Sequence, residues 1–157
     1  MRRKNRGQTE ATHVILLAIT MIVFVALLGS LGYIGFIANK VATEAQFMRI
    51  SGYVSSEIVR AYNLALSSNS SNSIISVSLS LSQAVCGHNY GITTKVVDGK
   101  PRVVAYAQDN ANIKSFSPVC NVNAEFGGTI YSTASQPTVK ISRSSNEVID
   151  IWLGNSP

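Results

Sequence analysis

The chain has 157 residues, of which 46% are hydrophobic and 13% are charged, and its formal net charge is +5 at pH 7. Four of the 13 basic residues lie in the N-terminal tail, and the other nine are nearly balanced by eight acidic residues. The tail residues are Arg2, Arg3, Lys4 and Arg6. Outside this tail the basic residues do not cluster, so the sequence carries no footprint of a nucleic-acid-binding protein.

An almost unbroken apolar run follows the tail at residues 14–38, and it contains no charge. A helix of this length crosses a hydrocarbon core of about 30 Å, and only a helix can do so, because lipid satisfies no backbone hydrogen bonds. Since positive charge is retained on the cytoplasmic side, we expect the N-terminus inside and residues beyond 38 outside. A cleaved secretory signal is the alternative, but its apolar region would be only about 7–15 residues.

The next segment, residues 39–66, has no proline and one glycine, Gly52. Apolar residues recur there at helical spacing, so we predict one continuous helix over 11–66, on the order of 80 Å long. An anchor joined to a separate exported helix is the alternative. One apolar row comprises Phe47, Ile50, Val54, Ile58, Ala61 and Ala65, and an overlapping row comprises Ile37, Val41, Ala45 and Met48.

Serine and asparagine fill residues 67–73, which predicts a linker that ends the helix. This segment holds the acceptor sequence Asn69-Ser70-Ser71, a candidate N-glycosylation site on an exported loop. The motif is short and frequent by chance.

The period changes to two from Ile74 onward, because Ile75, Val77, Leu79 and Leu81 alternate with serines. Residues 90–97 and 102–108 predict two strands of a hairpin, with a turn at Asp98-Gly99 and with Pro101 limiting the pairing nearby. Further strands are predicted at 129–132, 138–142 and 148–153. The predicted class is α+β: a long helix packed on a small antiparallel sheet in an exported domain, residues 67–157. So small a sheet needs cover on one face, which the helix would supply.

Two cysteines, Cys86 and Cys120, lie on the predicted exported side, where a disulfide is permitted, and we expect them to pair. Their spacing is poor for a metal site, and a nucleophile pair of Cys86 with His88 has no supporting residues. The acidic residues are few and scattered, and no phosphate loop or nucleophile elbow occurs. We therefore expect neither an enzyme nor a cofactor.

The basic leader, the segment Lys4-Asn5-Arg6-Gly7-Gln8, the apolar helix and the sheet together resemble archaeal type IV pilin-like proteins. The segment is similar to class III signal peptides, which implies cleavage between Gly7 and Gln8, a leader of residues 1–7 and a mature helix over 8–66. The region 75–108, with Cys-Gly-His-Asn-Tyr at 86–90, is also similar. The resemblance implies a prepilin peptidase, an assembly platform and copies of the chain or related pilins as partners. The implied location is the cytoplasmic membrane before assembly and a surface filament afterwards.

One residue departs from the family pattern, in which an acidic residue stands at the fifth mature position. Here that position is Thr12, and the carboxylate is Glu10, at the third. Glu10 would pair with a neighbour's N-terminal amine only in a shifted register; the alternative is that it is solvated at the membrane edge. Gly29, Gly32 and Gly35 would let helices approach closely during assembly, unless they are ordinary membrane-helix glycines.

Three functions follow from these patterns. The first is a major or minor structural subunit of a type IV pilus-like filament serving adhesion, motility, secretion or uptake. The second is an accessory or stator-like component that stays in the membrane, or a pseudopilin. The third is a membrane-anchored binding domain or enzyme unrelated to filaments.

Overall fold

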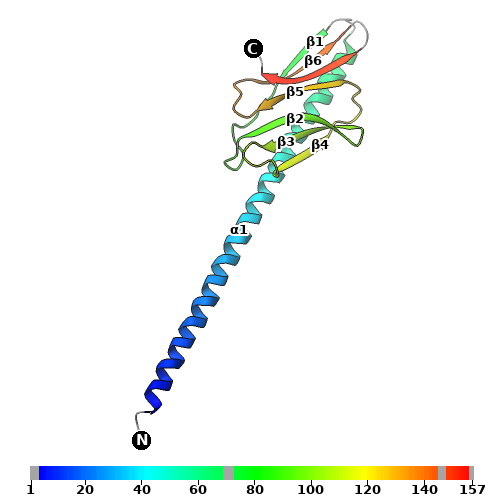
Figure 1. The fold of residues 1–157 in the computed structure, drawn as a ribbon. Helices are drawn as coiled ribbons and strands as arrows, with labels where there is room; N and C mark the ends of the chain where they lie inside the picture. Colours follow the sequence, from blue (N-terminus) through cyan, green and yellow to red (C-terminus); the bar gives the residue numbers. More distant parts are fainter. Residues whose placement is uncertain (1–3, 69–72, 145–147, 156–157) are drawn as a thin grey trace. The chain divides into compact units, whose positions relative to one another are not determined.

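The computed structural model describes residues 4–68, 73–144 and 148–155. Helix α1 (Lys4–Ser67) precedes seven strands that form one sheet in the order β1-β6-β7-β5-β2-β3-β4, an α+β architecture (Figure 1). The strands are β1 (Ser73–Ser78), β2 (Tyr90–Val97), β3 (Lys100–Ala107), β4 (Lys114–Pro118), β5 (Glu125–Tyr131), β6 (Pro137–Arg143) and β7 (Ile149–Asn155). The chain divides into two compact units, Met1–Asn39 and Lys40–Pro157.

Helix α1 is uninterrupted, as predicted, although it begins at Lys4 rather than near residue 11. Its last turn contains no basic residue of its own. Arg143 on β6 fills this role, because its Nη1 donates hydrogen bonds to the carbonyls of Ala65 at 3.3 Å and Ser68 at 3.1 Å. A guanidinium that satisfies the final carbonyls of a helix also complements the negative end of its dipole.

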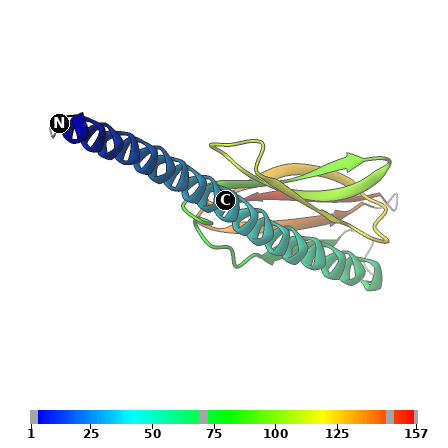
Figure 2. The ribbon, with the colours of Figure 1, turned by 90° about the horizontal axis from the view of Figure 1, so that it is seen from below.

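The buried face of α1 in the second unit confirms the predicted apolar row. Phe47, Val54, Ile58 and Ala61 are fully buried, and Ala65 nearly so. Figure 2 shows this part of the helix lying along one face of the sheet. The covered face presents Tyr90, Ile92, Ile130, Val139, Ile141, Ile151 and Leu153. The Phe47 and Tyr90 rings meet with their centroids 5.7 Å apart, a tilted aromatic contact at the centre of this core.

The hairpin of β2 and β3 is confirmed, and its turn explains its sequence. Asp98 and Gly99 have φ of 53° and 70°, as a two-residue turn requires when its twist matches the strands. Pairing runs to Val97 and Lys100 beside this turn and includes Pro101 opposite Val96. The prediction that Pro101 would limit strand pairing near the turn is therefore wrong, because the tight turn holds both strands in register up to their ends.

Two features of the sheet differ from the prediction. Strand β4 was not predicted, and it pairs with β3 at the edge of the sheet. The pairing of β5 with β7 is parallel, with Phe126 opposite Ile151, whereas a fully antiparallel sheet was expected. The reason is that β7 pairs with the preceding strand β6 and lies between β6 and β5, so its direction coincides with that of β5.

The predicted disulfide is wrong: Cys86 and Cys120 are free and exposed. The register explains why. Cys86 precedes β2, whose start lies opposite Ala107, whereas Cys120 follows β4, whose end lies opposite Arg102. These positions are at opposite ends of the strands, and five residues of strand extend about 17 Å. A disulfide requires Cα atoms within about 7 Å of each other.

Candidate functional site

The apolar segment of α1, residues 14–38, is the first candidate site, and it lies in the first unit. The helix is long and apolar enough to cross a membrane, and none of its most apolar window is buried. Every large hydrophobic side chain described between Val14 and Ile37 is exposed. An apolar surface this extensive requires an apolar environment, because soluble proteins rarely expose more than a few hundred Å² in one patch.

The hydroxyl groups in this segment are satisfied by the helix itself. Thr20 Oγ1 donates to the Leu16 carbonyl and Ser30 Oγ to the Ala26 carbonyl, each at 2.8 Å. Both bonds link residues four apart, so neither hydroxyl needs water or another chain. A hydroxyl bonded in this way avoids the free-energy cost of an unsatisfied polar group in lipid.

The glycines of the same segment lie open. A Cβ placed on Gly29, Gly32 or Gly35 would meet nothing within 4 Å. Each step of three residues turns by about 300°, so the three positions spread over roughly a third of the circumference. They form shallow places in an otherwise bulky apolar surface, where another helix can approach closely.

The residues predicted for leader cleavage and subunit pairing lie near the start of α1. Gly7, Gln8 and Glu10 lie within the helical backbone of α1, and Thr12 is exposed. The acceptor Asn69 lies outside the described residues.

A second apolar strip lies on the second unit. The predicted overlapping row began at Ile37 in the first unit, and its other members, Val41, Ala45 and Met48, are exposed on the second unit, in contrast to the buried row that includes Phe47. These three residues line an open pocket of about 450 Å³ together with β4, where Lys114 Nζ lies 5.8 Å from the centre of the Phe116 ring. This strip is an exposed side of α1 that lies beside the edge strand β4.

His88, in the turn before β2, pairs with Asp109, in the segment after β3. The Nδ1 atom of His88 lies 2.7 Å from Asp109 Oδ2, which joins this turn to the segment after β3. The hydrogen bond from His88 holds the pKa of the Asp109 carboxyl below its ordinary value of 3.8. His88 is thus engaged by a carboxylate, and Cys86 is a free exposed thiol at the tip of the same turn.

The outer face of the sheet, which α1 does not cover, carries aromatic residues that the sequence analysis did not single out. Tyr106 on β3 lies over Gly91, where a Cβ would be 2.6 Å from the ring, and it is hydrogen-bonded to Tyr131 on β5. Burial of the phenol, together with Tyr131, raises the pKa of Tyr106. Trp152 on β7 lies over Gly127 in the same manner. The sequence signal for Trp152 was the alternation of side chains along the strand at 149–155. It places Trp152 on the face of the sheet opposite to that of buried Ile151 and Leu153.

Metal ligands do not gather in this fold: over residues 4–68, 73–144 and 148–155, no group of three histidine, cysteine or acidic side chains is placed to hold an ion. Comparison with known proteins gives no relative, since no family model, no curated protein and no solved structure matches the chain.

Proposed function

We propose that this chain is a structural subunit, major or minor, of an archaeal type IV pilus-like surface filament, and that it assembles through the apolar segment of α1. The observation that carries the proposal is the exposure of the large apolar side chains from Val14 to Ile37. Before assembly, lipid covers this surface. Once the helix leaves lipid, the same surface needs equal apolar cover, which the same segments of other copies can supply.

The polar groups of the segment suit both environments. Thr20 and Ser30 are bonded within their own helix, so moving from lipid to a bundle of helices breaks none of their hydrogen bonds. The three open glycines favour close packing in the bundle, where dispersion contacts replace those with lipid tails.

The exposed strip of Val41, Ala45 and Met48 gives the second unit a role in the same assembly. It is an apolar surface on α1 that the second unit itself leaves exposed. In a filament, a neighbouring copy would cover it, and the buried row would meanwhile hold the sheet in place.

The alternative is an accessory or stator-like component that keeps its anchor in the membrane. Glu10 favours it, because its carboxylate stands at the third mature position and not at the fifth. The two proposals differ in whether the bond between Gly7 and Gln8 is cut and where the mature chain is found.

Mass spectrometry of the N-terminal peptide separates them, applied to membranes and to filaments sheared from native cells. A subunit starts at Gln8 and is recovered in filaments. A chain that starts at Met1 and stays in membranes would overturn the filament proposal. The variant Gly7→Val should block cleavage and remove the chain from filaments. Gly52→Ala is the control, because a Cβ there would meet Ser117 Oγ at an ordinary 3.9 Å.

A further inference from the structure

The geometry around Trp152 forms a flat aromatic platform on the outer face of the sheet. Trp152 is paired with Gly127 across β7 and β5. A Cβ on Gly127 would lie 2.5 Å from Cζ3 of the indole, and one on Gly154 would lie 3.1 Å from Nε1. The ring therefore rests where two side chains are missing, so one of its faces is against the backbone while the residue remains 58% exposed.

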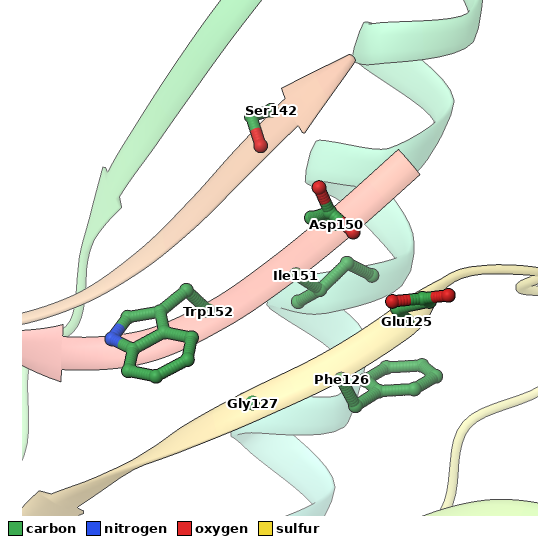
Figure 3. A pocket seen from close by; sticks show the side chains of 7 residues that line it. All are labelled: Glu125, Phe126, Gly127, Ser142, Asp150, Ile151 and Trp152. Atoms are coloured by element: carbon green, nitrogen blue, oxygen red, sulfur yellow. The ribbon is translucent and has the colours of Figure 1, made fainter. Parts of the chain in front are cut away.

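Polar groups stand at one edge of this platform. Glu125 and Asp150 are register partners on the parallel strands, and Ser142 pairs with Asp150 from β6. Together with Trp152 they line an open pocket of about 430 Å³, within the range of small-molecule sites (Figure 3). Figure 3 shows Asp150 and Glu125 on neighbouring strands and the indole farther along β7. Lys140, paired with Trp152 from β6, is the nearest cation on this face by register.

We propose that this pocket binds a saccharide. The free face of the indole offers a partner for the apolar C–H face of a pyranose ring, because an aromatic face carries partial negative charge. The carboxylates of Glu125 and Asp150 accept hydrogen bonds from sugar hydroxyls, and such charge-assisted bonds are about twice as strong as neutral ones. The Ser142 hydroxyl both donates and accepts. The ligand class is thus a neutral saccharide of a few rings.

A second copy of the chain fits this pocket less well. Neither carboxylate belongs to an ion pair within the described part of the chain, so a protein partner would bury both without compensation unless it supplied cations. A stable interface also covers about 800 Å² on each partner, far more than one indole and its rim. A polyol satisfies both carboxylates with its own hydroxyls and needs only a small area.

The test uses the fact that Trp152 is the only tryptophan in the chain, so intrinsic emission reports on this site alone. The full chain, in a detergent without a sugar headgroup, is titrated with chitotriose, a neutral trisaccharide, and with trigalacturonate, an anionic one. We expect a saturable change in emission with chitotriose. The Kd for trigalacturonate should be at least tenfold higher, because the carboxylates of Glu125 and Asp150 repel its negative charges.

Variants are measured by calorimetry with the same trisaccharide. Trp152→Ala should abolish binding, and the double variant Glu125→Gln/Asp150→Asn should weaken it at least tenfold. Val96→Ala is the matched control, since Val96 is 67% exposed on β2, does not line this pocket and should leave Kd unchanged. Unaltered binding in Trp152→Ala would overturn the proposal, as would no emission change up to about 10 mM of either sugar. An emission change that follows protein concentration without sugar would instead assign the pocket to a second copy. This binding does not depend on filament assembly, so the two proposals fail separately.

Discussion

The two parts of α1 on either side of Asn39 differ in how their apolar side chains are distributed. In the first unit these side chains surround the helix, and all of the large ones described are exposed. In the second unit they form a buried row that includes Phe47 and Ile58, while Met48 on another face is exposed. One helix therefore has two kinds of surface. The part with a single apolar face is covered by the sheet, whereas the part that is apolar on all sides needs lipid or similar helices around it.

In both parts of α1 some hydroxyls bond within the helix, as Ser51 and Ser56 do in the second part, but among the described residues only the second part also has hydroxyls bonded to the sheet domain. Thr20 and Ser30 bond to their own helix four residues back. In the second unit, Ser55 Oγ instead donates to the Pro118 carbonyl at 2.6 Å, a bond between α1 and β4. The first part is thus complete as a single helix, whereas the second part depends on contacts with its sheet.

The largest expected effect comes from removing the ring at the centre of the second unit. Phe47→Ala should lower the free energy of unfolding of this unit by about 3–5 kcal/mol, because it leaves a cavity against Tyr90. Chemical unfolding of the full chain in detergent, followed by Trp152 emission, measures this directly.

The neighbouring residue provides the control. Met48→Ala changes a side chain that is 61% exposed, and we expect a change within about 0.5 kcal/mol. If both variants lose the same stability, the one-sided burial of α1 would be contradicted.

A smaller free-energy change, but a large change in membrane retention, is expected from a substitution in the first unit. Val23→Asp places a carboxylate in the middle of the apolar segment, at a cost of about 2.5–3.5 kcal/mol at the centre of a bilayer. The fraction of the chain that resists carbonate extraction from membranes should fall, while Trp152 emission stays native. Val96→Asp makes the same change at a 67% exposed position of β2 and should leave membrane retention unaltered. Equal retention of both variants would show that the segment does not sit in lipid.

The parts of the fold that local patterns determine were predictable. The spacing of three and four from Phe47 to Ala65 gave the buried face of α1, and Asp98-Gly99 gave the hairpin turn. These features depend on residues near one another in sequence. The class of the fold followed from them, because a one-sided helix and alternating strands must cover each other.

The parts that were not predicted depend on distant residues. Strand β4 contains two serines and a proline, and it becomes a strand because β3 offers an edge to pair with. Gly127 and Gly128 lie inside β5. The first gives room to the Trp152 ring, and the second has φ of +85° and no space for a Cβ beside the Leu153 carbonyl. The platform was missed for the same reason, because its glycine and its tryptophan are on different strands.

The smallest expected effect concerns pH, and it should act on the second unit alone. The pKa of Asp109 is lowered by the hydrogen bond from His88, so the bond stabilises the fold above the carboxyl's ordinary value of 3.8 and this contribution is lost as pH falls through the lower folded value. Asp109→Asn should therefore lower the midpoint of thermal unfolding slightly at about pH 7, and the difference from the natural chain should vanish at about pH 2.

The control for this prediction is Asp98→Asn, because the Asp98 carboxylate lies 4.0 Å from Arg102, beyond hydrogen-bonding distance. Trp152 emission follows the sheet and far-ultraviolet circular dichroism follows the helix. The first unit has no described tertiary contact of this kind, so its helical signal should survive acid that shifts the sheet transition. A pH-independent difference between Asp109→Asn and the natural chain would mean that the ionisation of Asp109 contributes nothing to folding. Loss of the entire helical signal together with the sheet, and not only of the share from residues 40–67, would remove the distinction between the two parts of α1, because both would then depend on the same tertiary contacts.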